Sequence, residues 1–282
     1  MSLAPDGLVL VDKPGGMTSH DVVDAVRRAL ATRKVGHAGT LDPMATGLLL
    51  VGVGRATRLL RFFGDLPKTY EGTARLGIET DTLDAEGTVT STAPVVATRD
   101  DVERAIAAKV GHSAQRPPAY SAVKVRGRKL YEAARAGETL EAEPRSIQVD
   151  AFEVRAFEPP DIGFRVTCSG GTYVRVLLAD VGAELGCGAH LTTLRRTAIG
   201  PYTVANAASP ASLGPLRPLE DAVAHLPRIS VSEDEARAAA NGTILAPAGL
   251  EGPYAVFGPD DLLIGIYRDE GSKARPEVIL PR

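Results

Sequence analysis

Strict alternation over residues 70–77 (YEGTARLG) constrains the fold more than any other feature of this chain. From Tyr70 to Leu76 every second residue is apolar, aromatic or glycine, and the residues between are polar or charged. This period of two predicts a strand with one buried and one solvent-facing side. Residues 162–168 repeat the pattern, and residues 146–157 alternate with a change of phase near Asp150 that indicates a bulge. Such strands favour an antiparallel sheet over a doubly wound parallel one.

Helices are predicted between these strands. Thr18 lies three residues before Asp21, and Thr98 three before Asp101, which is the spacing of a capping box at a helix N-terminus. Residues 172–186 place apolar side chains on one helical face. Further predicted elements are a buried strand at residues 48–53 and a short helix at residues 129–137. The chain is therefore predicted to be α+β, with a mixed, mainly antiparallel sheet and flanking helices.

The distribution of proline predicts a boundary late in the chain. Residues 206–228 contain four prolines and are interpreted as a linker, which leaves residues 1–205 as the main domain. Beyond the linker, residues 229–282 predict a small, mostly β domain. Its expected elements include a hairpin across 258–261 and a last strand at 277–282.

Composition excludes several classes of protein. The opening stretch MSLAPDGLVLVDKPGG lacks the regions of a signal peptide, and no window holds the roughly 18 apolar residues of a membrane helix. Two cysteines and five scattered histidines supply neither a disulfide framework nor a zinc motif. The acids of DTLDAEG, residues 81–87, lack the spacing of a calcium loop. We expect a cytoplasmic protein with no metal, no cofactor and no membrane partner.

The net charge of −3 hides an uneven distribution. Residues 206–282 hold 7 Lys or Arg and 11 Asp or Glu, whereas the rest of the chain holds 25 and 24. Within that larger part, residues 116–129 (RPPAYSAVKVRGRK) carry five cations and no acid. Such a run is most often a solvated loop, but the tyrosines within and beside it indicate a surface for phosphates and bases.

A single carboxylate on a glycine-rich turn is the candidate for chemistry. Asp42 lies in GHAGTLDPMATGLLLVGVG, residues 36–54, between Leu41 and Pro43 and just before an apolar run. Pro43 biases Asp42 toward an extended backbone, and the glycines let another chain approach closely. The spacing alone leaves two interpretations open, a turn residue bonded to nearby backbone or a nucleophile.

Five sequence blocks resemble one family. The blocks DKPGGMTSHDVV, GHAGTLDPMATGLLLVGVGRATR, KTYEGTARLG, PPAYSAVKVRGRKLYEAARAG and SGGTYVRVLLADVGAELGCGAHLTTLRRTAIG occur in the order seen in bacterial tRNA pseudouridine-55 synthases of the TruB type. The resemblance covers residues 7–205, and residues 229–282 resemble that family's small PUA-type RNA-binding domain. It implies an isomerase that flips out uridine 55 of the tRNA T-loop and converts it to pseudouridine without cofactor or metal.

The resemblance also implies roles for individual residues. Asp42 matches the essential aspartate of the family, which acts on the nucleoside as nucleophile or base. Tyr70 matches a tyrosine that stacks on the uracil and helps proton transfer, and Arg175 matches an arginine paired with the aspartate. Residues 112–137 match a mobile thumb that closes on RNA. The residues implied to contact RNA are His37, Arg116, Tyr120, Lys124, Arg126, Arg128 and Lys129, together with Lys13, which would support either the fold or the phosphates.

Two alternatives stay open at this point. One is an RNA-binding, tRNA-folding chaperone with little turnover, which would not need Asp42. The other is a pseudouridine synthase for a different RNA, selected by residues 112–137 and by the C-terminal domain. The expected partner is the T-arm stem-loop of tRNA, and the expected state is a monomer.

Overall fold

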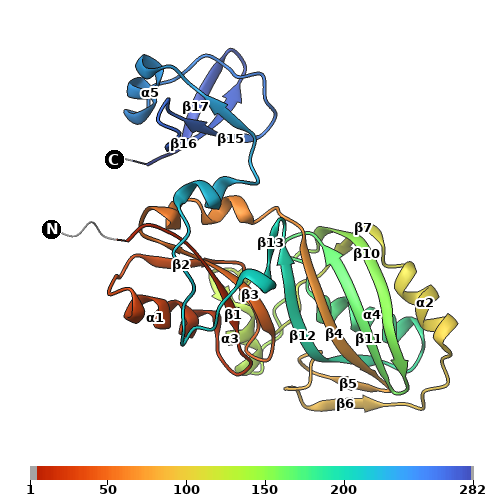
Figure 1. The fold of residues 1–282 in the computed structure, drawn as a ribbon. Coiled ribbons are helices and arrows are strands. Elements are labelled where there is room, and N and C mark those ends of the chain that lie inside the picture. The colour runs from red at the N-terminus through yellow and green to blue at the C-terminus, as the bar shows by residue number, and fades with distance from the viewer. Residues whose placement is uncertain (1–4, 281–282) are drawn as a thin grey trace.

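The computed structural model describes residues 5–280 and contains one sheet of nine strands (Figure 1). Its main path follows the order β1 (Gly7–Lys13), β3 (Thr46–Val53), β12 (Ala189–Ile199), β4 (Lys68–Leu76), β11 (Asp161–Cys168), β10 (Arg145–Glu158) and β7 (Gly111–Gln115). In addition, β2 (Val35–Ala38) pairs with β3, and β13 (Tyr202–Thr203) pairs with β12. Among the described residues, every pairing in this sheet is antiparallel except that of β12 with β3. The predicted α+β fold with a mixed, mainly antiparallel sheet is confirmed.

Sequence periodicity does not predict β12, although this strand lies in the middle of the sheet. Its register against β4 shifts twice, the second time between Arg196 and Ala198. Each shift turns the following side chains to the other face, so the alternation expected of a strand is lost. The bulge predicted near Asp150 is present, because the β10–β11 register shifts between Val149 and Ala151.

Helices pack on different parts of this sheet. They are α1 (Ser19–Ala29), α2 (Arg99–Ala107) and α4 (Val174–Glu184), whereas the short α3 (Leu130–Arg135) contacts the small β-hairpin of the predicted thumb. The predicted capping boxes at Thr18 and Thr98 are both present. Valines of α1 join a core with β1 and β3, whereas α4 packs on β12 and α2 on β10 around a second core. The N-terminal turn of α4 is thereby held against the centre of the sheet.

Short elements complete this part of the chain. They are the 3₁₀ helices η1 (Gly54–Arg58), η2 (Leu60–Phe63), η3 (Val204–Asn206) and η4 (Leu219–Val223), and the strands β5 (Ile78–Thr80), β6 (Val89–Thr92), β8 (Lys124–Val125) and β9 (Arg128–Lys129). The strands β8 and β9 form a small hairpin within the segment predicted as a thumb.

The C-terminal residues form a separate sheet, drawn in blue in Figure 1. Its order is β14 (Arg228–Ser230), β15 (Pro253–Phe257), β16 (Leu263–Glu270) and β17 (Lys273–Ile279), and α5 (Glu233–Ala240) packs on it. The predicted hairpin across 258–261 joins β15 to β16. The predicted strand at 277–282 is the end of β17; residues 281–282, like the first four of the opening stretch, lie outside the described part of the chain.

Residues 206–228, predicted as a linker, run beside β1. Ala208 forms a bridge with Val11, Arg217 forms one with Leu8, and the apolar side chains of η4 are buried. The segment is thus packed against the large sheet before the chain enters the small one. Within residues 5–280, no helix has the length and apolar character needed to span a membrane.

Candidate active site

Asp42 lies on the turn between β2 and β3, and the residues around it fix the backbone of that turn. Leu41 is buried, its N–H donates to Ser19 Oγ at 2.9 Å, and Ser19 Oγ donates to the Leu41 carbonyl at 3.2 Å. On the other side, the Ala45 N–H donates to the Asp42 carbonyl at 3.0 Å. The Asp42 side chain is 43% exposed and lines a cavity. Among the described residues its carboxylate accepts no backbone hydrogen bond, so the turn-residue interpretation lacks its defining contact.

Lys13 supports the same turn from inside the protein. Its side chain is fully buried, and Nζ donates to the carbonyls of Pro14 at 3.1 Å, Met17 at 2.6 Å and Pro43 at 3.1 Å. Burial lowers the pKa of this ammonium, and the nearby Asp42 carboxylate opposes that change. Since an ammonium has three donors and all three are used, Lys13 has none left for a phosphate. Of the two roles predicted for Lys13, these contacts favour support of the fold.

Arg175 lies in the first turn of α4 and is buried, with only 5% of its side chain exposed. Its Nε is 3.6 Å from Asp42 Oδ2 and has no hydrogen-bond partner among the described residues. Nη1 donates to the Thr82 carbonyl at 2.9 Å and lies 3.5 Å from Asp84 Oδ2, while Nη2 donates to the Tyr120 carbonyl at 2.6 Å. One guanidinium therefore connects the Asp42 turn, the loop after β5 and the base of the predicted thumb.

Asp84 is a residue of this site that sequence reasoning missed. Its side chain is 7% exposed, and Oδ1 accepts from Thr82 Oγ1 at 2.6 Å and from the Glu86 N–H at 3.1 Å. Together with Asp42 it places two carboxylates beside the single cation of Arg175. The sequence offered little signal for this, because Asp84 and Arg175 are 91 positions apart in the chain.

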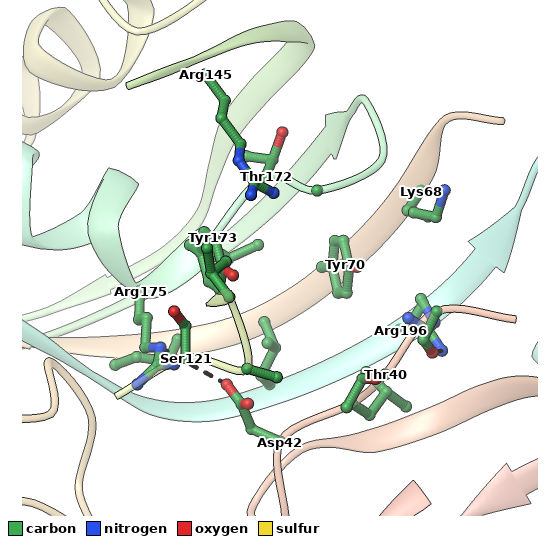
Figure 2. Close-up of a pocket in the computed structure, with 18 residues that line it drawn as sticks. Thr40, Asp42, Lys68, Tyr70, Ser121, Arg145, Thr172, Tyr173, Arg175 and Arg196 are labelled. Atoms are coloured by element: carbon green, nitrogen blue, oxygen red, sulfur yellow. Dashed lines mark hydrogen bonds and ion pairs between the residues drawn. The ribbon is translucent and has the colours of Figure 1, made fainter. Parts of the chain in front are cut away.

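Tyr70 projects from β4 into the same cavity (Figure 2). Its side chain is largely buried, and burial raises the pKa of the phenol, while the neighbouring Arg196 guanidinium opposes this rise. A phenol that stays protonated offers an aromatic face for stacking and a hydroxyl for proton relay.

The cavity has a volume of about 420 Å³ and brings Asp42, Tyr70 and Arg175 together. Figure 2 shows Asp42 and Arg175 joined by an ion pair, with the Tyr70 ring between them and the basic side chains of Lys68 and Arg196. Residues 121–123 of the predicted thumb form part of the wall. This volume falls in the range of small-ligand sites, so the cavity suits one nucleoside rather than a stacked helix.

His37 does not line the cavity, although it lies on β2 close to the Asp42 turn. Its ring centroid is 5.8 Å from that of His20, and its Nδ1 is buried without a hydrogen-bond partner among the described residues. Burial lowers the pKa of His37, and His20 and Arg196 lower it further, so the ring is neutral near pH 7. Its contact with a flipped nucleotide stays a prediction.

Three of the five cations in the predicted thumb are paired with acids that lie outside the run 116–129. The pairs are Arg116–Glu141 at 2.9 Å, Arg128–Glu138 at 2.6 Å and Lys129–Glu132 at 3.7 Å. By contrast, Lys124 and Arg126 are exposed and make no ion pair within 4.0 Å in the described part of the chain. The Tyr120 hydroxyl donates to Asp81 at 3.2 Å. The acid-free run therefore overstates how much charge the thumb has free for RNA.

Comparison with known families assigns the whole site to one class of enzyme. Residues 27–174 match the family model described as TruB family pseudouridylate synthase (N terminal domain). Residues 175–225 match the tRNA pseudouridylate synthase B C-terminal domain, and residues 226–281 match tRNA Pseudouridine synthase II, C terminal. The chain belongs to the TruB family of pseudouridylate synthases, and it is an enzyme that isomerises uridine to pseudouridine. Membership favours turnover over the binding-only alternative.

Individual proteins agree with this assignment over nearly the full chain. The chain is 47% identical to the tRNA pseudouridine synthase B of Thermobifida fusca, over 97% of this chain and 98% of that protein. It is 44% identical to the protein of the same name from Mycolicibacterium paratuberculosis, over 99% and 98%. Among solved structures it is similar to the "Crystal Structure of a Cbf5-Nop10-Gar1 Complex", with 27% identity and a TM-score of 0.75 over 98% of this chain and 85% of that chain.

Proposed function

We propose that this chain isomerises the uridine at position 55 in the T-loop of tRNA, with Asp42 as the residue that acts on the nucleoside. The observation that carries the proposal is the Asp42 carboxylate, which reaches the cavity 3.6 Å from the buried guanidinium of Arg175. The ring of Tyr70 lines the same cavity. The names of the relatives, tRNA pseudouridine synthase B, support tRNA as the substrate.

The reaction rearranges one nucleoside and adds no atom. The N1–C1′ bond breaks, the uracil turns, and C5 bonds to C1′; C5 then loses a proton and N1 gains one. Asp42 can attack C6 or C1′, or it can remove the proton from C2′. No second carboxylate is needed to activate a water molecule, because the reaction is not a hydrolysis. Asp84 instead shares Arg175 with Asp42.

Access to the cavity requires the target base to leave the folded T-loop. Extruding a stacked base costs a few kcal/mol, which contacts to the surrounding RNA must supply. In this proposal residues 1–205 form the catalytic domain, residues 206–228 the linker and residues 229–282 a PUA-like domain that binds the RNA. The enzyme would act on tRNA in the cytoplasm as a monomer.

The test is release of tritium from a T-arm stem-loop that carries tritium at C5 of uridine 55. The proposal expects stoichiometric release under single-turnover conditions, together with pseudouridine at that position after digestion of the RNA. A second stem-loop with cytidine at position 55 and labelled uridines elsewhere serves as the control. Release from the control RNA alone, or no release from either RNA, would contradict the proposed site of modification.

The pairing of thumb cations leads to a graded prediction for RNA affinity. The double variant Lys124→Gln/Arg126→Gln should raise the Kd for tRNA. It should also flatten the log–log salt dependence by about 0.7 to 0.9 for each phosphate that the variant no longer neutralises. The matched double variant Arg116→Gln/Arg128→Gln should have a smaller effect, because both of its arginines are already paired with glutamates. The measurement is Kd over a salt series for the three proteins.

Two outcomes would contradict the expected difference between the two double variants. If both double variants lose the same affinity and the same slope, the ion pairs of the thumb break on binding, and all five cations of the run act alike. If neither variant changes Kd, the segment is a solvated loop, and RNA lies elsewhere.

Removal of divalent metal should leave the chemistry intact. Within residues 5–280 there is no group of three or more His, Cys, Asp or Glu side chains placed to hold a metal ion. We expect EDTA to leave the single-turnover rate on a pre-folded T-arm stem-loop unchanged. A polyamine is added to one series to hold the RNA fold. A strict requirement for magnesium in that series would argue against the proposed role of Asp42.

A further inference from the structure

Charged side chains line the cavity unevenly: within residues 5–280 the one lining carboxylate is Asp42, and the basic lining residues are Lys68, Arg145, Arg175 and Arg196. At one end the Asp42 carboxylate lies beside Arg175, and Asp84 contacts the same guanidinium from behind the cavity lining. At the other end lie Lys68 and Arg196, which are 6% and 1% exposed. Among the described residues neither of these two cations has a carboxylate within 4.0 Å. Buried cations without an anionic partner are unusual, so the basic end calls for an explanation.

Lys68 is accounted for by the backbone around it. Its Nζ donates to the carbonyls of Phe63 at 3.2 Å, Gly64 at 2.7 Å and Leu66 at 2.7 Å. These three bonds use every donor of the ammonium and tie down the turn that follows η2. Burial, followed by the neighbouring Arg196, lowers the pKa of Lys68 to about 8. Lys68 therefore supports the structure, as Lys13 does at the Asp42 turn.

Arg196 has donors to spare. Its Nε donates to the Leu48 carbonyl at 2.8 Å and Nη2 to the Gly39 carbonyl at 3.0 Å, which fixes the plane of the guanidinium. A guanidinium has five N–H donors, and these two backbone bonds leave others toward the cavity that Arg196 lines. A Cβ at position 39 would lie 3.5 Å from Nη1, and Gly39 has φ +77°, so glycine leaves that edge uncovered.

Strand pairing places this guanidinium beside Tyr70. Arg196 on β12 is the direct register partner of Tyr70 on β4, so both side chains leave the sheet on the same face. A uracil stacked on the Tyr70 ring would present its edge to the fixed guanidinium. The two carbonyl oxygens of the base, O2 and O4, are its strongest hydrogen-bond acceptors.

From this arrangement we infer that Arg196 is a further catalytic residue, which donates a hydrogen bond to a uracil carbonyl oxygen. The inference rests on the proposed function of the site. When the N1–C1′ bond breaks, its electron pair stays with the uracil, and the negative charge spreads to O2 and O4. A preorganised cation stabilises that charge without any reorganisation, whichever atom Asp42 acts on. The charge disappears when C5 bonds to C1′; C5 then loses its proton and N1 gains one.

The experiment combines protein variants with single-atom changes in the RNA. T-arm stem-loops carry uridine, 2-thiouridine or 4-thiouridine at position 55, and single-turnover rates come from nucleoside analysis of the digested RNA. For the wild type, one thio RNA should react more slowly than uridine, because sulfur accepts hydrogen bonds poorly. Arg196→Gln should lower the rate on uridine about 10²-fold, as loss of one oxyanion donor does, with little change in Kd. In that variant the thio effect should disappear.

Arg195→Gln is the matched control. Arg195 is the neighbouring arginine on β12, but it pairs with Asp12 at 2.7 Å and does not line the cavity. Its variant should keep both the rate and the wild-type thio effect. A thio effect that persists at full size in Arg196→Gln would overturn the inference. So would a loss confined to Kd and its salt slope, which would make Arg196 a phosphate contact.

Two further outcomes would decide the role of Arg196 if the variants cannot be compared directly. If Arg196→Gln does not fold, as judged by its thermal transition, the wild type decides alone: equal rates on all three RNAs would overturn the hydrogen bond to uracil. Arg196→Lys then replaces the glutamine variant in the comparison. If the wild type modifies no uridine in the T-arm, the proposed function fails and the inference falls with it, whereas an active wild type without a thio effect removes only the role of Arg196.

Discussion

Asp42→Asn is expected to abolish pseudouridine formation, by at least about 10⁴-fold in single-turnover rate, while the Kd for tRNA stays within a few-fold of the wild type. Asparagine has nearly the shape of aspartate but neither attacks carbon nor takes a proton. The change should not unfold the protein, because the side chain is 43% exposed and the turn is held by backbone contacts to Leu41 and Ala45. RNA affinity depends instead on many phosphate contacts that Asp42 does not make.

The matched control for this variant is Asp84→Asn. It makes the same chemical change at the other carboxylate beside Arg175. Oδ2 of Asp84 is 3.5 Å from Arg175 Nη1, and Oδ2 of Asp42 is 3.6 Å from Arg175 Nε, but Asp84 does not line the cavity. We expect a reduced rate in this control, far above that of Asp42→Asn. Tritium release is measured for both variants over a range of enzyme concentrations. Equal losses in the two variants would mean that Asp42 acts only through the charge of the site, and turnover that persists in Asp42→Asn would remove it from the chemistry.

The fold could be predicted where local patterns are regular. Residues 70–76 and 162–168 alternate cleanly and form β4 and β11, and the capping boxes mark the starts of α1 and α2. The central strand β12 could not be predicted, because two register shifts interrupt its alternation. Its position between β3 and β4 depends on pairings with distant segments, which no local pattern encodes.

The residues of the candidate site also fall into two groups, those that a sequence motif indicates and those that only the tertiary structure brings together. The L-D-P and T-Y-V-R motifs point to Asp42 and Arg175 by resemblance, and the structure brings the two within 3.6 Å. Asp84 and Arg196 escaped notice because each becomes part of the cavity wall or its support only through tertiary structure. The cations of the predicted thumb are a different case. Within residues 116–129 the sequence offers these cations no acid, yet three of them pair with Glu132, Glu138 and Glu141 beyond the end of the run.

The geometry around Arg175 makes a conservative replacement unfavourable. The guanidinium extends in three directions, with Nε toward Asp42, Nη1 toward Thr82 and Asp84, and Nη2 toward the Tyr120 carbonyl. A lysine ammonium is a compact charge with a different reach, and it cannot satisfy these directions at once. A carbonyl left without its donor in a buried site costs about 1 to 3 kcal/mol. The charge would survive the replacement, but the alignment of the Asp42 carboxylate and the tie to the thumb would not.

Arg175→Lys should therefore lower the single-turnover rate by about 10²- to 10³-fold, the range found when one preorganised donor is removed. The control is Arg165→Lys on β11. Arg165 pairs with Glu71 at 3.5 Å, nearly the distance of the Arg175–Asp42 pair. However, the side chains of Arg165 and Glu71 are both about half exposed, and neither lines the cavity. That pair should contribute at most about 1 kcal/mol, so its variant should keep the wild-type rate.

Rates, Kd and thermal transitions are measured for both variants. A near wild-type rate for Arg175→Lys would show that positive charge alone is sufficient beside Asp42. A loss of rate that tracks a loss of thermal stability would assign Arg175 to the fold instead of the chemistry.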